Sequence, residues 1–359
     1  MEIIHETILE VDINLLKKNY YVLKNKLNPN TKIIAVIKAY GYGHGDIMLA
    51  KKLEKIGAYA LWVADFEEGV RLRKSGILTS IIVANPGMKS INEIIINNLD
   101  VVIYNLEILK LYAKLNKEIC IHIKFNSGMN RYGFDNKDID LISKILLNNP
   151  KLKLKSVCSH LSASENHKKD DFTNKQCDIF EKICEILFKS IGYRVDRHIL
   201  NTNGVIRFPQ NEYEMVRIGI GLYGVSEDDG LRQIGTLKSV VSQIREIKKG
   251  DQIGYEASFT ASKDMKIGVI PFGYADGLNR KLSNKNGIVI INNFPCPIIG
   301  EISMDSCMVN LTNTETKNGD TAIIFSEENT VLSIAKKLDT IPYEILSTLN
   351  RRIKRVYSC

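Results

Sequence analysis

The sequence predicts an α/β fold of two domains: an N-terminal (β/α)8 TIM barrel over residues 11–230 and a mainly β C-terminal domain over residues 231–359. Three observations lead to this prediction. The chain has 359 residues, and at about 150 residues per domain this length favours two domains. Strand-like apolar runs alternate with helix-like stretches up to residue 224. Beyond residue 231, short β-like runs separated by Gly, Asn, Asp and Pro replace that alternation.

The barrel prediction depends on eight apolar runs in the first part of the chain. Near-continuous runs of Val and Ile are typical of parallel strands that are covered on both faces. Stretches with helical apolar spacing separate them, as at 46–57 and 174–190. A doubly wound open sheet would give a similar pattern, so the alternation alone gives the barrel a modest advantage. The eight runs are 32–39, 59–65, 80–86, 100–105, 119–126, 155–162, 198–202 and 215–224.

The second part of the chain reads as a mainly β domain that ends in two helices. The helices are expected at 330–339 and near 342–350. We expect the segment 1–10 to add a strand to this domain, because ETILEVD precedes the first helix of the barrel. The β-like runs are 235–247, 266–274, 287–293, 297–303 and 321–325.

Composition and charge exclude several classes of protein. A content of 44% hydrophobic and 25% charged residues is ordinary for a globular protein and excludes a disordered chain. The formal net charge is +8, but Lys and Glu are interspersed and no basic run is interleaved with aromatic residues. We therefore expect a lysine-rich surface and no nucleic-acid partner.

The N-terminus and the cysteines indicate the compartment. No uncharged apolar run approaches the ~18–20 residues that span a bilayer, and Glu2, His5 and Glu6 interrupt the stretch that a signal peptide would need. The seven cysteines form no CxxC pair and are odd in number, so we expect reduced structural thiols and no metal site. These features predict a cytoplasmic chain with no membrane segment.

A lysine at the end of the first barrel strand is the first candidate for chemistry. Active sites of barrels lie at the C-terminal ends of the strands. Lys38 ends the run AVIK, where neighbouring cations and partial desolvation would lower the pKa of its ammonium group. A neutral lysine suits Schiff-base chemistry, although a lysine that merely extends out of the barrel is the alternative. The loop AYGYGHG (39–45) follows, and its glycines allow the backbone to approach a ligand closely.

A second candidate lies near the eighth strand. The segment 217–221, RIGIG, supplies backbone N–H groups without obstructing side chains, and Thr202 adds a hydroxyl at the end of the seventh strand. Loops after the seventh and eighth strands commonly bind phosphate in barrels. A lysine and a phosphate site across one barrel mouth suggest pyridoxal phosphate as the cofactor.

Seven segments of the chain resemble, in the same order, the alanine racemase family of fold type III pyridoxal phosphate enzymes. They span nearly the whole sequence, and the family's fold is a barrel plus a C-terminal β domain that also holds the N-terminal strand. The resemblance therefore implies pyridoxal 5′-phosphate as the cofactor. The segments are AVIKAYGYGHG (35–45), KFNSGMNRYGF (124–134), SHLSASE (159–165), MVRIGIGLYG (215–224), GYEASF (254–259), PFGYADG (271–277) and GEISMDS (300–306).

The resemblance implies two catalytic bases. Lys38 is identified as the lysine that holds the cofactor and as the base on the D-face of the substrate. Tyr255 of the partner subunit is identified as the base on the L-face, which implies a homodimer with shared active sites. Racemisation removes a proton from one face and returns it on the other, so a base is needed on each side.

Further positions match residues that hold the cofactor and substrate. Arg217 resembles the arginine that faces the pyridine nitrogen and keeps it unprotonated, and His160 resembles its partner. Arg131 resembles the residue that contacts the cofactor's phenolic oxygen and the substrate carboxylate, and Lys124 matches a lysine that is often carbamylated and then fixes Arg131. The remaining matches are the phosphate contacts Tyr42, Thr202, Gly219 and Ile220, and the entrance and substrate residues Tyr274, Met304 of the partner subunit and Asp305 of the partner subunit.

The chain departs from the family pattern at three places. Asn126 stands where the family usually has Asp, and Lys354 where it usually has Pro. The tyrosine that touches the phosphate and the substrate pocket aligns with Arg351 or, as the weaker alternative, Asn350, which predicts acceptance of L-serine. The resemblance thus extends to the serine racemases of glycopeptide (vancomycin) resistance, whose membrane module this sequence lacks, so the chain could be such a catalytic domain.

The sequence therefore predicts a pyridoxal phosphate-dependent amino acid racemase that interconverts L- and D-alanine, L- and D-serine, or both, for cell-wall peptidoglycan. A racemase of broader or basic amino acid scope is an alternative. A fold type III decarboxylase is a further one, disfavoured because those enzymes generally pair the pyridine nitrogen with an acid where this chain has Arg217. A small cofactor-holding barrel protein without catalysis is disfavoured by residues 231–359.

Overall fold

The computed structural model describes residues 4–228 and 230–358, which form two compact units. The barrel unit comprises Lys17–Gly41 and Asp46–Leu222. The C-terminal unit comprises the N-terminal segment up to Leu16, the short segment Tyr42–Gly45 and the chain from Tyr223 onward. Nothing in the sequence indicated that Tyr42–Gly45, just after Lys38, groups with the C-terminal unit.

The barrel unit is built on eight parallel strands in the order β8-β7-β6-β5-β4-β3-β2-β9. The first strand, β2, also pairs with the last, and the Arg217 N–H donates to the Leu200 carbonyl beyond β8 at 3.0 Å, so the sheet is nearly closed. This confirms the predicted α/β barrel. The strands are β2 (Lys32–Val36), β3 (Ala60–Val63), β4 (Ser80–Val83), β5 (Asp100–Ile103), β6 (Ile119–Lys124), β7 (Leu152–Cys158), β8 (Asp196–His198) and β9 (Met215–Ile218).

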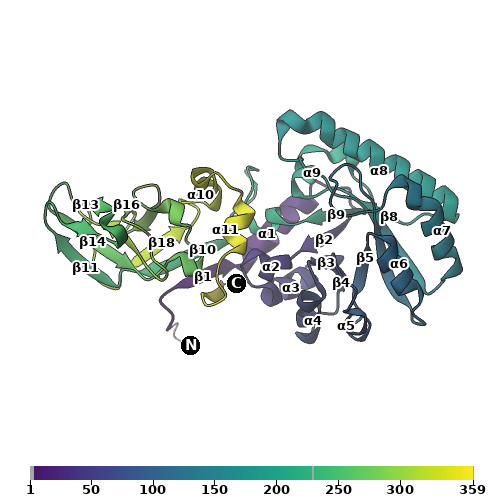
Figure 1. Ribbon diagram of the computed structural model, residues 1–359, viewed down its shortest axis with the longest axis horizontal. Helices are drawn as coiled ribbons and strands as arrows, with labels where there is room; N and C mark the ends of the chain where they lie inside the picture. The colour runs from purple at the N-terminus through teal and green to yellow at the C-terminus, as the bar shows by residue number, and fades with distance from the viewer. Residues whose placement is uncertain (1–3, 229, 359) are drawn as a thin grey trace. The chain divides into compact units, whose positions relative to one another are not determined.

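Helices α3 to α8 lie outside these strands (Figure 1). Several strands are shorter than the apolar runs that predicted them, because tight turns begin at the C-terminal ends of the strands. The run at 32–39 is a strand only as far as Val36, and a turn starts at Lys38. The helices and helical turns of this part of the chain are α1 (Ile13–Lys24), α2 (Lys38–Tyr42), α3 (Asp46–Lys55), α4 (Phe66–Lys74), α5 (Ile91–Ile96), α6 (Leu106–Ala113), α7 (Ile139–Asn148), α8 (Asp170–Ile191), α9 (Thr202–Arg207) and η4 (Ile220–Tyr223).

The C-terminal unit is built on a nine-stranded sheet in the order β11-β14-β17-β16-β15-β18-β10-β1-β19. Strand β1 (Ile8–Asp12) comes from the N-terminus and lies between β10, to which it is antiparallel, and β19, to which it is parallel. The other strands are β10 (Gly235–Val240), β11 (Gln243–Ile247), β14 (Met265–Ile270), β15 (Ile288–Ile291), β16 (Phe294–Ile299), β17 (Cys307–Asn310), β18 (Thr321–Phe325) and β19 (Lys354–Ser358).

The run at 235–247 forms two strands where the sequence indicated one. Val241 and Ser242 separate β10 from β11, and these strands stand seventh and first in the order of the sheet. Six strand spacings of ~4.8 Å would place them about 29 Å apart in a flat sheet. The three Cα steps between them reach at most about 11 Å. The sheet must therefore curl so that its first and seventh strands meet.

Smaller elements complete the C-terminal unit. Strands β12 (Gln252–Ile253) and β13 (Phe259–Thr260) form a separate pair, and helices α10 (Val331–Leu338) and α11 (Pro342–Ser347) precede β19. No helix in the described residues is both long enough and apolar enough to cross a membrane. The six described cysteines are free thiols.

Candidate active site

Lys38 lies at the C-terminal end of β2, at the start of an unusual turn. Ala39, Tyr40 and Gly41 have left-handed backbone conformations with φ of 53°, 56° and 61°. Non-glycine residues in this region cost about 1–3 kcal/mol each and concentrate at functional sites. Glu68 holds the turn, because its Oε1 accepts the Ala39 N–H at 2.7 Å while its Oε2 accepts the Ala64 N–H beyond β3 at 2.8 Å. The position of Lys38 is thus fixed from two adjacent strands.

The environment of Lys38 lowers the pKa of its amine. Desolvation by the surrounding protein is the largest cause and the positive charge of Arg131 the second, whereas Glu68 opposes the shift and Arg217 adds a smaller lowering. Lys124, at the end of β6, experiences a similar field, and burial together with the nearby cations lowers its pKa to about 8. Four cationic side chains therefore act on one another at this end of the barrel, which suits a ligand that carries negative charge.

Arg217 is the most buried of these cations, and its guanidinium is engaged on one side. Nη1 donates to Nδ1 and to the carbonyl of His198, the latter at 3.2 Å. Nη2 donates to the carbonyls of Ser159 and Ile199 at 2.5 and 3.1 Å, and approaches His160 Nδ1 at 3.2 Å. Within the described part of the chain, Nε is the guanidinium nitrogen without a partner. One directed donor therefore remains for a ligand.

The two histidines whose Nδ1 atoms face the Arg217 guanidinium are held neutral. Burial, and then the charge of Arg217, lowers the pKa of His160 and of His198 well below the usual range. A neutral ring offers one nitrogen lone pair, and both Nδ1 atoms lie where Arg217 needs acceptors. Arg131, whose charge also acts on His160, is exposed on the loop after β6.

A small polar cradle lies where β9 ends and α9 begins. Thr202 Oγ1 accepts the N–H groups of Gly219 and Gly221 at 3.1 and 3.3 Å, which leaves its own hydroxyl hydrogen to be donated. A Cβ atom on Gly221 would lie 2.6 Å from Thr202 Cγ2, so this close approach requires glycine. Ile220 begins the next helical turn and is buried. The predicted phosphate contacts Thr202, Gly219 and Ile220 are thus brought together.

The glycine loop after Lys38 packs against protein, whereas the sequence suggested close approach to a ligand. A Cβ on Gly43 would lie 2.1 Å from the Leu346 carbonyl oxygen, within the C-terminal unit. Arg355, on β19, donates from Nε to the Gly43 carbonyl at 2.9 Å. Tyr42 is buried there as well, with its ring stacked on Tyr223 at a centroid distance of 4.7 Å. These contacts fix the loop as part of the C-terminal unit.

Tyr255 lies on an exposed turn of the C-terminal unit. It begins η5 (Tyr255–Ala257), between β12 and β13, and its side chain is 69% exposed. The next two residues, Glu256 and Ala257, have left-handed φ values of 59° and 49°. A large aromatic residue on a strained, exposed turn is unusual for a structural role and fits a residue that acts on another molecule.

The candidate substrate residues of the C-terminal unit share one turn. The N–H groups of Tyr274 and Ala275 donate to the carbonyls of Ser303 and Met304 at 3.0 and 2.9 Å, so η6 (Tyr274–Asp276) lies against the segment before β17. The side chains of Tyr274 and Met304 are both exposed. Asp305 accepts a hydrogen bond from Arg352 at 2.7 Å. The predicted residues Tyr274, Met304 and Asp305 are therefore neighbours.

The two candidate specificity residues differ in their surroundings. The Asn350 side chain is engaged at both ends, with Nδ2 donating to the Ala275 carbonyl and Oδ1 accepting the Arg352 N–H, each at 2.9 Å. Arg351 is exposed. Asn350 thus serves the local backbone, and Arg351 is the better candidate for contact with a ligand.

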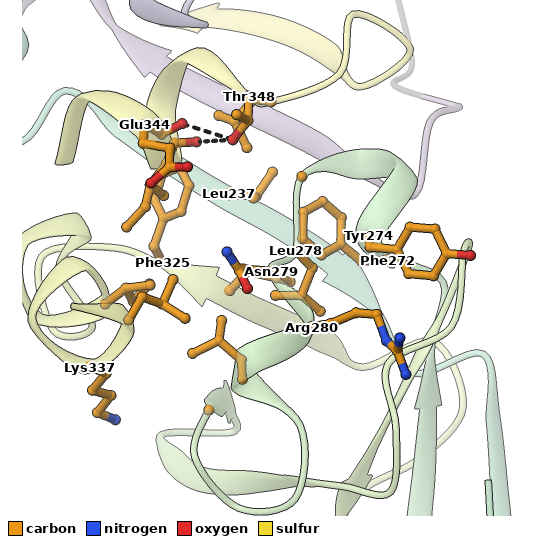
Figure 2. Close-up of a pocket in the computed structure, with 18 of the residues that line it drawn as sticks. Leu237, Phe272, Tyr274, Leu278, Asn279, Arg280, Phe325, Lys337, Glu344 and Thr348 are labelled. Carbon is orange, nitrogen blue, oxygen red and sulfur yellow. Dashed lines mark hydrogen bonds between the residues drawn. The ribbon is translucent and has the colours of Figure 1, made fainter. Parts of the chain in front are cut away.

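An apolar cavity of about 320 Å³ lies elsewhere in the C-terminal unit (Figure 2). Its walls are mainly apolar, for example Phe272, Leu278 and Phe325, and Lys337 and Glu344 lie at its rim. Tyr274 is the one predicted site residue in its lining, and the Tyr274 hydroxyl points away from the other side chains. The cavity is lined by none of the four cationic side chains around Lys38, so it is not the candidate catalytic site.

Sequence reasoning missed Glu68, His198 and Arg352. Glu68 occupies an ordinary amphipathic helix pattern, and its contact with the Lys38 turn depends on the packing of β2 beside β3. His198 stands inside the quoted run HILNT, but a single histidine in an apolar run carries no signal by itself. Arg352 is recognisable only once Asp276 and Asp305 are brought together, which the structure does through two hydrogen bonds.

Fold and candidate site together define a two-domain barrel protein with a lysine of lowered pKa at the mouth of the barrel. Comparisons with known proteins agree. A model of the alanine racemase N-terminal domain matches residues 11–227, and a model of the alanine racemase C-terminal domain matches residues 234–357. The chain belongs to the alanine racemase family.

Individual relatives match over their full length. The alanine racemase of Helicobacter acinonychis is 33% identical, with 97% of this chain and 98% of the relative covered. A solved alanine racemase structure from Clostridium difficile 630 is 32% identical at a TM-score of 0.93, covering 99% of this chain and 97% of that one. A Bartonella henselae alanine racemase structure with covalently bound pyridoxal phosphate is 29% identical at a TM-score of 0.87. The match covers 99% of this chain and 100% of that one.

Proposed function

We propose that the chain is an alanine racemase that uses pyridoxal 5′-phosphate and interconverts L- and D-alanine. Its membership of the family supports this function, as does the cofactor bound to the Bartonella henselae relative. The observation that carries the proposal is the position of Lys38 at the barrel mouth, after β2, where Arg131 and Arg217 act on its amine and its pKa is lowered.

The residues at the barrel mouth fit this cofactor. When bound, pyridoxal phosphate supplies a carbonyl that bonds to an amine and a ring that withdraws electrons from the substrate's α-carbon. The cationic cluster around Lys38 and Lys124 suits its phosphate and phenolate charges. The Thr202 hydroxyl is free to donate to phosphate oxygen. The residues that we propose to hold the cofactor are Lys38, Tyr42, Arg131, His160, Thr202, Arg217, Gly219 and Ile220.

Two bases on opposite faces of the substrate would perform the racemisation. Lys38 Nζ would take or return the α-proton on one face, a role that a lowered pKa favours. The phenolic oxygen of Tyr255 of the partner subunit serves the other face. The exposure of Tyr255 supports this assignment, because a side chain 69% exposed in one chain is accessible to a second. The proposed enzyme is therefore a homodimer with shared sites.

Arg217 restrains side reactions in this scheme. Its free Nε–H is the donor suited to an acceptor nitrogen of the cofactor ring. Because arginine does not release its proton, a ring nitrogen that accepts the Arg217 Nε–H would stay unprotonated. The ring would then withdraw electron density from the α-carbon less strongly. The α-carbon proton is then exchanged without further chemistry such as transamination.

We further propose that L-serine is accepted. Arg351 replaces a bulky aromatic residue of the family with a side chain whose donors suit a hydroxyl. Because Tyr274 lies beside Met304 and Asp305 within one chain, Tyr274 of the partner subunit, Met304 of the partner subunit and Asp305 of the partner subunit would together line the entrance and the carboxylate site. The D-amino acids formed would serve peptidoglycan synthesis, which loss of growth without added D-alanine in a deletion strain would test.

The deciding experiment is racemisation by the purified protein loaded with pyridoxal phosphate. L-alanine should give D-alanine, measured by chiral chromatography, until both enantiomers are equal. Borohydride reduction followed by peptide mapping should place the cofactor on Lys38. Absence of D-alanine, or a label on another lysine, would overturn the proposal.

A further inference from the structure

A row of buried polar side chains crosses the interior of the barrel, beginning at Arg217. Arg217 on β9 contacts His198 on β8, and His198 Nε2 lies 2.8 Å from the Ser156 hydroxyl on β7. Ser156 Oγ lies 2.7 Å from Nδ1 of His122 on β6. Four adjacent strands thus contribute one side chain each, and all four side chains are buried.

The row ends at a carboxylate on the next strand. His122 Nε2 faces Asp100 Oδ2 on β5 at 3.5 Å. Asp100 Oδ2 also accepts the hydroxyl of Ser80, on β4, at 2.6 Å. The Asp100 side chain is 16% exposed, so this end of the row reaches solvent while its centre does not. We call the series Arg217, His198, Ser156, His122 and Asp100 the interstrand relay.

The direction of every hydrogen in the relay follows from Arg217. A guanidinium only donates, so His198 Nδ1 must accept and His198 carries its hydrogen on Nε2. That Nε2–H donates to Ser156, whose own hydrogen then has one acceptor within reach among the described residues, His122 Nδ1. His122 accordingly carries its hydrogen on Nε2, which lies 3.5 Å from Asp100 Oδ2 and makes no hydrogen bond within the described residues, so Asp100 acts on His122 through its charge. The donors thus all point from Arg217 toward Asp100.

The relay helps to stabilise the buried positive charge of Arg217. Arg217 is only 5% exposed, and among the described residues no carboxylate forms an ion pair with it. A buried cation without a counter-charge is costly unless polar groups are oriented around it. Asp100 polarises His122, which makes His122 a better acceptor for Ser156, and the same effect passes on to His198.

We propose that Asp100, His122 and Ser156 are positioning residues that fix the tautomer of His198 and so hold the Arg217 guanidinium in the orientation that its task requires. This inference deepens the proposed function and rests on it for the role of Arg217. None of the three residues touches the reacting atoms. They act through His198, which is the residue that Arg217 contacts directly.

Ser156→Ala in the cofactor-loaded enzyme tests the proposal. The variant removes the central hydroxyl and leaves His198 Nε2–H without an acceptor. We expect kcat to fall about tenfold with KM for L-alanine within about twofold, as one lost buried hydrogen bond warrants. The absorption spectrum of the bound cofactor should change, because His198 no longer holds the Arg217 guanidinium in a single orientation. Nitrogen-15 NMR of the histidine rings should show His198 losing its single Nε2–H tautomer.

Ser143→Ala is the matched control. Ser143, on α7, is also buried, and its hydroxyl has no hydrogen-bond partner among the residues that the structure describes, so the same atom is removed outside the relay. It should leave kcat, the cofactor spectrum and the His198 signals unchanged. If Ser156→Ala behaves like Ser143→Ala, or loses thermal stability alone, the relay does not position Arg217.

Asp100→Asn tests the negative charge of Asp100 apart from the shape of its side chain. It also keeps the proposal testable if Ser156→Ala does not fold. Asparagine keeps an oxygen acceptor for Ser80 but removes the negative charge. We expect kcat to fall about threefold, with the same sense of spectral change, and no further fall when the change is added to Ser156→Ala. Equal costs in both backgrounds would overturn the proposal. The change in the His198 NMR signals between the wild type and Ser156→Ala tests the relay even if the protein racemises nothing, so the two proposals fail separately.

Discussion

The candidate residues of the barrel and those of the C-terminal unit are prepared for chemistry in opposite ways. Arg217 is enclosed and its guanidinium is oriented by neighbours in the same chain, and neighbours in the same chain also lower the pKa of Lys38. Tyr255 and Met304 are exposed, with side chains 69% and 54% accessible. The candidate residues of the barrel are therefore tuned by their own chain, whereas those of the C-terminal unit would gain their environment from another surface.

This difference separates two kinds of failure. A change in the barrel should alter how the cofactor is held and how it absorbs light. A change in the C-terminal unit should leave a normally loaded enzyme that turns over slowly. The following variants test that division.

Lys38→Ala should have the largest effect. Loss of the amine removes both the covalent attachment of the cofactor and one of two bases, so we expect racemisation to fall more than about a thousandfold. Borohydride should no longer trap the cofactor on the chain. Lys32→Ala is the control, because Lys32 lies at the other end of β2 and pairs with Asp196. A Lys38→Ala enzyme that keeps wild-type turnover would refute the assignment.

Tyr255→Phe should lower kcat by about a hundredfold or more and leave the cofactor spectrum intact, because only a base is lost. Tyr193→Phe, another exposed tyrosine, should change nothing. Mixing Lys38→Ala and Tyr255→Phe chains should restore part of the activity, since a hybrid dimer holds one site with both bases. Verified subunit exchange without recovery would contradict a shared site.

Arg217→Glu should slow racemisation by about a hundredfold and change the product range, because an acid lets the ring nitrogen keep a proton. A new long-wavelength absorption band and more transamination are expected. Arg217→Gln removes the arginine without supplying a proton, so it should slow turnover without producing the band. Identical spectra for the Glu and Gln variants would place Arg217 away from the ring nitrogen.

Lys124 should show a pH-dependent reaction with carbon dioxide. Its pKa of about 8 means that the amine is protonated and unreactive below pH 8 and becomes neutral as the pH rises through that value. Carbon-13 NMR in labelled bicarbonate should show a carbamate signal that is stronger at pH 8.5 than at pH 6.5 and is absent in Lys124→Met. We expect Lys124→Met to lower kcat by about threefold to tenfold, through looser positioning of Arg131. A signal that persists in Lys124→Met would assign the carbamate elsewhere.

The sequence predicts the barrel site well and the C-terminal unit less well, for a physical reason. Strand ends are marked by apolar runs, so Lys38, Lys124 and Arg217 can be placed at one edge from periodicity alone. Residues such as Ser156 and His122 meet only through the register of neighbouring strands. The curl that joins β10 to β11 and the grouping of Tyr42–Gly45 with β19 depend on contacts between distant segments, which local patterns do not encode.

The smallest expected effect concerns Arg351 and the choice between alanine and serine. An apolar pocket rejects a substrate with one added hydroxyl only weakly, by about a hundredfold at most. Replacing a tyrosine ring with Arg351 removes bulk and adds donors for that hydroxyl. We therefore expect kcat/KM for L-serine to lie within about tenfold of that for L-alanine, and Arg351→Tyr to move the ratio several-fold toward alanine.

Asn350→Tyr is the matched comparison for this last test. The Asn350 side chain already bonds to Ala275 and to the Arg352 N–H, so its replacement removes two local hydrogen bonds and should lower stability. The serine-to-alanine ratio should stay near the wild-type value, because Asn350 serves the backbone. If serine is at least about a hundredfold poorer than alanine and Arg351→Tyr leaves that ratio unchanged, specificity resides elsewhere in the site.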